Sequence, residues 1–298
     1  MRNVPGDRYV GTLLGGEKAM KVGVNLLLWS AQMGPDAPDL IRKAGEMGFD
    51  GVEIFIDEPA RIDCAALKRA ADDCGLGLTC CSIVGPDRHL ISDDPAIRQQ
   101  AKDYLRAACD VTAEVGADTF CGPLYAAVGV LAGRPRTETE WQRAVDGLRE
   151  VAPYADECGV TLALEPLNRF ETYFVNIAAD AVKLCQAVGH PRVKVHLDTF
   201  HMGIEEKDIP AAIRATGPHL WHMHCSENDR GTPGTGHTEW DGVFAALREI
   251  GYDRWLVIES FVLGNEAIAK AAAIWRDIAP SGDDLAREGL AFLREMAG

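Results

Sequence analysis

The sequence predicts an α/β protein that folds as a single (β/α)8 barrel, a TIM barrel, with an extra helix near its C-terminus. From Lys21 onward, short apolar runs alternate with longer amphipathic stretches, and eight such pairs follow one another. Strands that pair in parallel need crossovers of this kind. Eight pairs in about 250 residues match the usual size of the barrel. A Gly-x-Gly-x-x-Gly after the first strand would favour an open dinucleotide-binding sheet instead, and that motif is missing.

The expected strands are the eight short apolar runs, each followed by a helical pattern. In chain order they cover residues 22–29, 51–55, 78–84, 118–122, 161–165, 193–198, 220–224 and 255–259. Clear helical patterns lie at residues 96–116 and 140–159. The second begins beside Thr137 and Glu140, whose spacing predicts a capping box, and it ends in Cys-Gly.

The two ends of the chain complete this organisation. Residues 1–19 lack the continuous apolar stretch of a signal peptide, and we interpret them as a loosely ordered extension. Residues 20–298 then form one barrel domain, since no low-complexity linker interrupts them. Residues 265–298 contain two helical segments, which predict an eighth helix plus a cover or an oligomer contact.

Composition limits the partners and the compartment. With 30 basic and 45 acidic residues, the formal charge is −15, which disfavours nucleic acid and anionic membrane as partners. The charge also aids solubility, which is the simpler explanation for it. No apolar run approaches transmembrane length. Nine scattered cysteines without a C-x-x-C fit free thiols in a reducing compartment, and we expect the cytoplasm.

Four successive expected strands end in a residue type that binds metal ions: Glu165, Asp198, His224 and Glu259. Catalytic groups of such barrels lie at the carboxyl ends of the strands. Side chains alternate along a strand, so an inward Glu165 sends Leu164 toward the helices. A single strand-end carboxylate is more often a helix cap, and a single His is more often a core residue. Four in succession, each from a different strand, favour a shared site.

This donor set selects a type of ion. Three carboxylates and one imidazole suit Mn²⁺ or Mg²⁺, with Co²⁺ as an alternative, whereas structural zinc usually recruits thiolates. Four protein ligands leave about two positions of an octahedral shell open. A sugar carbonyl and the neighbouring hydroxyl would fill them, and the ion would then acidify the adjacent C–H.

Four segments resemble the D-tagatose 3-epimerase/D-psicose (allulose) 3-epimerase family of xylose isomerase-like TIM barrels. They are residues 164–171 (LEPLNRFE), 196–206 (HLDTFHMGIEE), 224–236 (HCSENDRGTPGTG) and 257–261 (VIESF). The resemblance implies that Glu165, Asp198, His224 and Glu259 bind the metal and that Glu165 and Glu259 also transfer protons through a cis-enediolate. It further implies substrate contacts by Glu171, His201 and Arg230, free ketoses as substrates, and a homodimer or homotetramer.

On pattern alone, the remaining candidates keep a second interpretation. His201 also fits a solvent-facing loop, and Glu171 a surface acid, while Arg230 lies in a Gly-rich loop of the kind that often binds phosphate. His196 and His222 are interpreted as supporting or packing groups. The other candidates are open between a functional and a structural role: Glu205 and Glu206 at a helix start, Trp29 as a sugar wall or core residue, and residues 122–125 and 134–141 as lining of the distal sugar end.

The leading hypothesis is therefore epimerisation of a free ketose at C3. An aldose–ketose isomerase and an inosose-type dehydratase would use the same metal site, because both begin with proton abstraction beside a carbonyl. A sugar-binding barrel without catalysis is a further alternative, but it needs no base on each face of its ligand.

Overall fold

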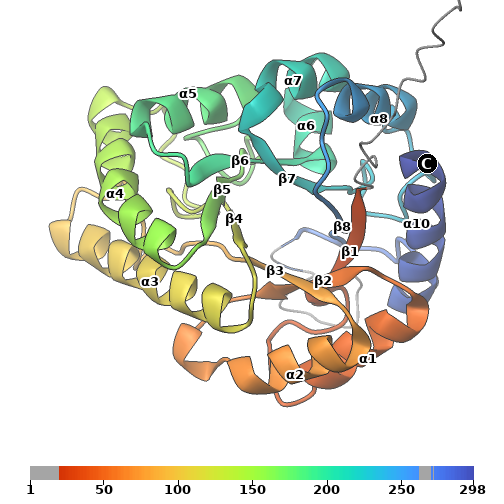
Figure 1. The fold of residues 1–298 in the computed structure, drawn as a ribbon. Coiled ribbons are helices and arrows are strands. Elements are labelled where there is room, and N and C mark those ends of the chain that lie inside the picture. The colour runs from red at the N-terminus through yellow and green to blue at the C-terminus, as the bar shows by residue number, and fades with distance from the viewer. Residues whose placement is uncertain (1–19, 262–269, 271) are drawn as a thin grey trace, which may run out of the picture.

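The computed structural model describes residues 20–261, 270 and 272–298, and it is a closed parallel barrel with strand order β1 to β8. Figure 1 looks into the barrel, with the helices arranged around the ring of strands. This confirms the predicted fold class, including the extra C-terminal helix. The expected extension at residues 1–19 and most of the first helical segment of the tail lie outside the described residues.

All eight expected strands are present. Their bounds are β1 Lys21–Asn25, β2 Gly51–Phe55, β3 Gly77–Cys81, β4 Thr119–Gly122, β5 Thr161–Leu164, β6 Val193–Asp198, β7 Leu220–His224 and β8 Trp255–Ile258. Two of these strands, the first and the third, end three or more residues before the predicted position, and the fifth and eighth end one residue before it. The first strand stops at Asn25, because the Asn25 side chain accepts a hydrogen bond from the backbone N–H of Leu27 and starts the 3-10 helix Leu26–Leu28. The third stops at Cys81, where the Ser82 hydroxyl donates to the Ile56 carbonyl and the chain enters a loop.

Helices follow the strands and cover the barrel. They are α1 Ala37–Met47, α2 Cys64–Cys74, α3 Pro95–Glu114, α4 Glu138–Glu157, α5 Ala178–Val188, α6 Thr199–Glu205, α7 Ile209–Thr216, α8 Trp240–Glu249 and α10 Gly282–Ala297, with short 3-10 helices at Pro59–Arg61 and Gly217–His219. The predicted capping box is confirmed: the backbone N–H of Glu140 donates to the Thr137 hydroxyl, and the Glu140 carboxylate accepts from the Thr137 N–H. Helix α10 packs against α8, β1 and β8 and closes the ring.

The main hydrophobic core lies between the strands and the helices, and it contains the outward residues Leu164, Leu197 and Ile258. A smaller apolar cluster of Cys81, Cys121 and Ala163 lies on other strand positions, apart from that core. This alternation is the one expected of a barrel, and it turns the strand-end polar residues inward.

The amino ends of the strands are closed by the Trp255 indole. A Cβ on Gly51 would lie 2.5 Å from this ring, and one on Gly77 would lie 2.6 Å from it. Only glycine leaves room for the indole at these two positions. The site therefore lies at the other end.

Candidate active site

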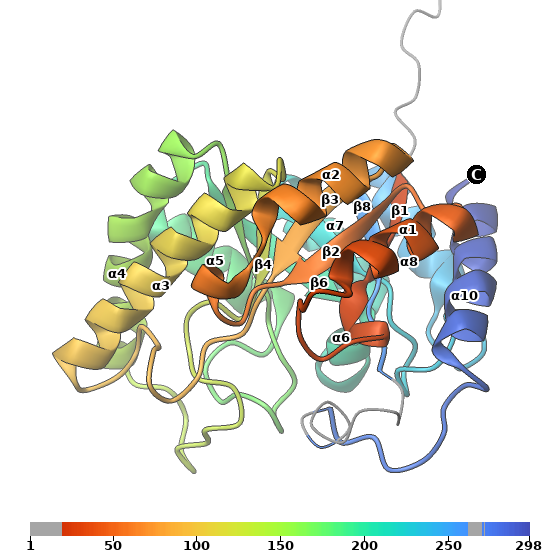
Figure 2. The ribbon, with the colours of Figure 1, turned by 90° about the horizontal axis from the view of Figure 1, so that it is seen from below.

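The carboxyl ends of the strands open into a cavity of about 310 Å³. Figure 2 shows long loops gathered along the lower edge of the molecule, at the end of the barrel away from the C-terminus. The large apolar side chains that line the cavity are those of Leu27, Phe55, Ile83, Val128, Leu167, Phe200 and Phe261. Its polar lining includes Glu165, Glu171, His201, His224, Arg230 and Glu259.

The structure brings together the four residues predicted as metal ligands. Glu165, Asp198, His224 and Glu259 each offer one ligand atom, and these atoms lie within 4.8 Å of one another. His224 Nδ1 is 3.4 Å from Glu259 Oε2 and 4.0 Å from Asp198 Oδ2. Asp198 and His224 are at the ends of β6 and β7, whereas Glu165 and Glu259 come one residue after β5 and β8. The four strands therefore deliver their side chains to one point.

Burial and neighbouring charges shift the pKa values of the three carboxyl groups in different directions. Burial raises the pKa of Glu165 well above its ordinary value, and the charge of Glu259 raises it further. Burial also raises the pKa of Asp198, against the opposing charge of Arg230. For Glu259, burial acts in the same direction, but the charges of His224 and Arg230 outweigh it and hold the pKa at about 2. The metal-free cluster therefore favours a proton on Glu165 and an ionised Glu259.

The donor set fits a hard divalent cation. It consists of carboxylate oxygens and one imidazole nitrogen, which Mn²⁺ and Mg²⁺ accept. Glu165 Oε1 and His224 Nδ1 are buried and have no hydrogen-bond partner within the described parts of the chain. A cation bound at this point would satisfy both of these ligand atoms.

Arg230 lies beside the cluster. Its Nη1 donates to Asp198 Oδ2 at 2.6 Å and to Glu259 Oε2 at 2.9 Å. The guanidinium stacks on the Phe200 ring, 4.1 Å from the ring centroid, and is 5.3 Å from the centroid of Phe261. Arg230 has a φ of 65°, a left-handed conformation that is unfavourable for a side chain of this size. The loop therefore accepts strain where it places this cation.

His201 and Glu171 meet through Asn168. The Asn168 backbone N–H donates to His201 Nδ1 at 3.1 Å, and its side-chain amide donates to Glu171 Oε1 at 2.8 Å. Burial lowers the pKa of His201 well below its ordinary value, and the charge of Arg230 lowers it further. The other ring nitrogen, Nε2, lies 3.3 Å from Arg230 Nη2 and 3.7 Å from Glu165 Oε1. His201 is buried on α6, so its interpretation as a solvent-facing loop residue is wrong.

Comparison with known proteins decides the family. Residues 41–296 match the family described as xylose isomerase-like TIM barrel. The chain belongs to this family. Its relatives include the D-psicose 3-epimerase of Agrobacterium fabrum, 34% identical over 91% of this chain and 95% of the relative, and the ketose 3-epimerase of Arthrobacter globiformis, 33% identical over 93% and 96%. A solved structure of D-allulose 3-epimerase from Methylomonas sp. in complex with D-allulose superposes with a TM-score of 0.89, at 30% identity, and the match covers 94% of this chain and 98% of that one.

Within this xylose isomerase-like barrel, sequence reasoning missed Glu53. This carboxylate lies in the middle of β2 and is completely buried, yet it contacts side chains from four other strands. The sequence contains one indication of such a role, because Glu53 is an acid between Val52 and Ile54 in an otherwise apolar strand. Its partners include His222 and His224, so the interpretation of His222 as a supporting group matches its position.

Sequence reasoning also missed Glu227, which organises the loop after β7. Its carboxylate accepts hydrogen bonds from the backbone N–H groups of Asn228, Gly234 and Thr238 and from the indole N–H of Trp240. Burial raises the pKa of Glu227, but these donors outweigh burial and hold the pKa at about 2. The loop that carries Arg230 is therefore built around one ionised carboxylate.

Several weaker candidates have structural roles. Glu205 pairs with Arg169, and Glu206 accepts the N–H of Ala178 at the start of α5. The Trp29 indole donates to Asp283 on α10 instead of lining the cavity.

The two segments expected at the distal end of the sugar differ from each other. Gly122 and Pro123 line the cavity, and the buried Tyr125 hydroxyl donates to the Glu165 carbonyl at 2.6 Å. Residues 134–141 instead form the end of the loop before α4 and its first turn, where Arg134 pairs with Glu140, and none of them lines the cavity.

Proposed function

We propose that this protein is a metal-dependent ketose 3-epimerase that inverts the C3 centre of a free ketose. The observation that carries the proposal is the placement of Glu165 and Glu259 directly after β5 and β8. Both line one cavity with His224, and their ligand atoms lie within 4.8 Å of those of Asp198 and His224. Relatives over nearly the whole chain carry the names ketose 3-epimerase and D-psicose 3-epimerase.

Inversion needs two proton-transfer groups, because a single base tends to return the proton to the face it came from. For one epimer, Glu259 removes the C3 proton, leaving a cis-enediolate, and Glu165 delivers a proton to the opposite face. The reverse reaction exchanges the two roles.

We assign the binding of the cation to Glu165, Asp198, His224 and Glu259. Mn²⁺ is proposed first, with Mg²⁺ and Co²⁺ as alternatives, since carboxylates dominate the donor set. When bound, the cation would supply electrophilic polarisation of the substrate carbonyl.

The side chains around the cluster would orient the sugar. His201 lines the cavity and would hydrogen-bond a substrate oxygen or hydroxyl, while Glu171 would accept a hydrogen bond from a hydroxyl. Arg230 is already engaged by two carboxylates, which favours a neutral sugar over a phosphorylated one. The cavity of about 310 Å³ is at the lower end of the range for small-molecule sites and suits a single monosaccharide.

Deuterium incorporation followed by NMR tests the proposal. Enzyme loaded with Mn²⁺ is incubated in D₂O with fructose, tagatose or ribulose and then quenched with chelator. Exchange at C3 with a new epimer is expected. Exchange at C1 with an aldose product would indicate an isomerase, and loss of water from a cyclic polyol would indicate a dehydratase. Absence of exchange in every free ketose would contradict the proposal.

The assembly is proposed on the family resemblance, and the location on the nine scattered cysteines without a C-x-x-C. We propose a homodimer or homotetramer, which light scattering measures directly, and a cytoplasmic protein. Within the described residues, no helix is long and apolar enough to cross a membrane.

A further inference from the structure

Beneath the proposed metal ligands, the Glu53 carboxylate joins two histidines of β7. We infer that Glu53 is a positioning residue: it holds His224 so that Nδ1 is the nitrogen presented to the cation. The inference rests on the metal site of the proposed function, but it concerns this chain's own hydrogen bonds.

Glu53 is surrounded by donors. Its Oε1 accepts from His224 Nε2 at 2.7 Å and from Asn25 Nδ2 at 2.9 Å. Its Oε2 accepts from His222 Nε2 at 2.8 Å, from Thr79 Oγ1 at 3.1 Å and from Cys121 Sγ at 3.2 Å. An ionised carboxylate can accept all five of these contacts at once.

Barrel geometry explains why these groups meet. Asn25 and Thr79 stand opposite Glu53 in the register of β1 and β3. His222 and His224 are two residues apart on β7, so both side chains point to the same side of the sheet. The carboxylate therefore bridges the barrel interior between β2 and β7, and each of its oxygens receives one imidazole.

This bridge decides how His224 faces the cluster. A metal-binding imidazole is neutral, with one N–H donor and one acceptor, and His224 Nε2 lies 2.7 Å from Glu53 Oε1, where it would be the donor. Nδ1 is the remaining acceptor, and it faces Glu259 Oε2 and Asp198 Oδ2. A carboxylate behind a metal-binding histidine fixes the ring orientation and makes it a stronger ligand.

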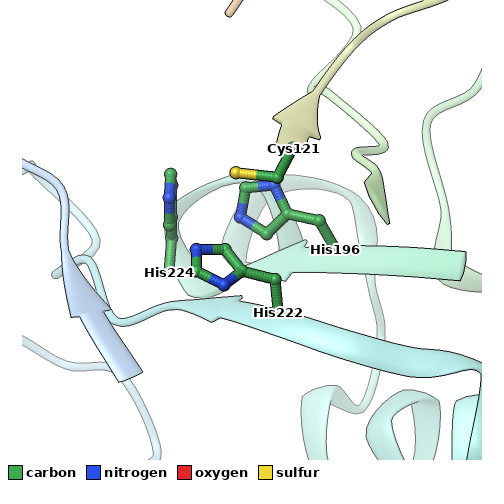
Figure 3. Close-up of side chains that lie close together, drawn as sticks. All are labelled: Cys121, His196, His222 and His224. Atoms are coloured by element: carbon green, nitrogen blue, oxygen red, sulfur yellow. The ribbon is translucent and has the colours of Figure 1, made fainter. Parts of the chain in front are cut away.

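A second metal site is the competing explanation. Figure 3 shows the Cys121 sulfur and the rings of His196, His222 and His224 close together, and their ligand atoms lie within 4.8 Å of one another. Three of the four side chains, however, already direct a ring nitrogen or the sulfur at Glu53. Of the four, only His224 lines the cavity.

His196 is the fourth member of this group. Both of its ring nitrogens are buried without a hydrogen-bond partner inside the described ranges. Its ring centroid lies 4.0 Å from that of His224 and 5.1 Å from that of His222, both edge-on. His196 therefore packs against the two rings that Glu53 holds, and this contact further limits their rotation.

Metal affinity of the Glu53→Gln variant provides the first test. Metal-free protein is titrated with MnCl₂, and free Mn²⁺ is followed by electron paramagnetic resonance. A glutamine accepts at one oxygen only and turns an NH₂ group toward one of the two imidazole N–H groups. Mn²⁺ binding should weaken by about 10- to 100-fold. Thr79→Val is the matched control: it removes another donor to Oε2 but leaves both imidazoles in place, so its Mn²⁺ affinity should stay at the wild-type level.

Histidine NMR of the wild-type protein provides a second test that does not depend on how the variant folds. In protein saturated with diamagnetic Mg²⁺, ¹⁵N-resolved spectra should show a proton on His224 Nε2 and none on Nδ1. The reverse tautomer, or a natively folded Glu53→Gln variant with unchanged Mn²⁺ affinity, would overturn the inference. A second bound metal ion per chain that is lost in Cys121→Ala would overturn it in favour of the second site.

These outcomes are separate from those of the proposed function. A protein that binds one Mn²⁺ through His224 Nδ1 but epimerises no ketose contradicts the function and leaves the role of Glu53 standing. A protein that binds no divalent ion contradicts both.

Discussion

Replacing Glu227 by Gln should destabilise the fold by about 3 kcal/mol, because the loop after β7 depends on one ionised carboxylate. Its two oxygens accept four hydrogen bonds at 2.9 to 3.0 Å, and the residue is completely buried. A pKa held at about 2 instead of its ordinary 4.5 corresponds to roughly 3 kcal/mol in favour of the ionised form. Glutamine keeps one acceptor oxygen and opposes the other pair of donors with an NH₂ group. The loss of two charge-assisted hydrogen bonds, at about 1.5–3 kcal/mol each, gives a figure of the same size.

The sign of the pH dependence follows from the lowered pKa. Stability from Glu227 is fully present above the unfolded pKa near 4.5 and is lost as the pH falls from there toward about 2. The difference between wild type and Glu227→Gln should therefore be largest at neutral pH and smaller at about pH 3.

Urea unfolding followed by circular dichroism, at both pH values, measures these free energies. Glu249→Gln is the control, because it makes the same chemical change in an exposed pair with Arg214 and should cost less than about 1 kcal/mol. Activity should also fall in Glu227→Gln, since the side-chain hydrogen bonds that it loses hold the loop that carries Arg230. Equal unfolding free energies for the two variants at neutral pH would refute this reasoning.

Three further predictions concern catalysis, the metal and the fold. Glu259→Gln should lower C3 exchange by at least about 100-fold, read by deuterium NMR; retention of exchange would exclude Glu259 as the base. Removal of metal with a chelator should abolish turnover, and added Mn²⁺ should restore it. Mn²⁺ should also raise the melting temperature, because a ligand that binds only the folded state stabilises that state. Activity that survives full chelation would exclude metal dependence. Gly51→Ala should destabilise by about 1–3 kcal/mol, because the new methyl group meets both the Gly77 carbonyl oxygen and the Trp255 indole. Gly203→Ala, where an added Cβ meets nothing within 4 Å, is its control, and equal melting temperatures for the two would refute the prediction.

The sequence by itself determined the barrel, the position of its strands and the four strand-end residues. Each of these depends on a local pattern: an apolar run marks a buried strand, and the last residue of such a strand lies at the carboxyl end of the barrel. The four family-like segments added Glu171, His201 and Arg230, which line the same cavity. Strand ends were less certain, as β1 shows, because a single side-chain hydrogen bond from Leu27 to Asn25 is enough to end it.

Only the tertiary structure decided which buried groups face one another. Glu53 is a mid-strand acid in the sequence, and its meaning appears only when the closed barrel places His222 and His224, 169 and 171 residues away, against its two oxygens. Likewise, nothing local distinguishes Glu227 as the organiser of its loop or joins Arg230 to Asp198 and Glu259. These pairings are long-range and electrostatic, and their strength comes from burial, which a sequence pattern does not specify.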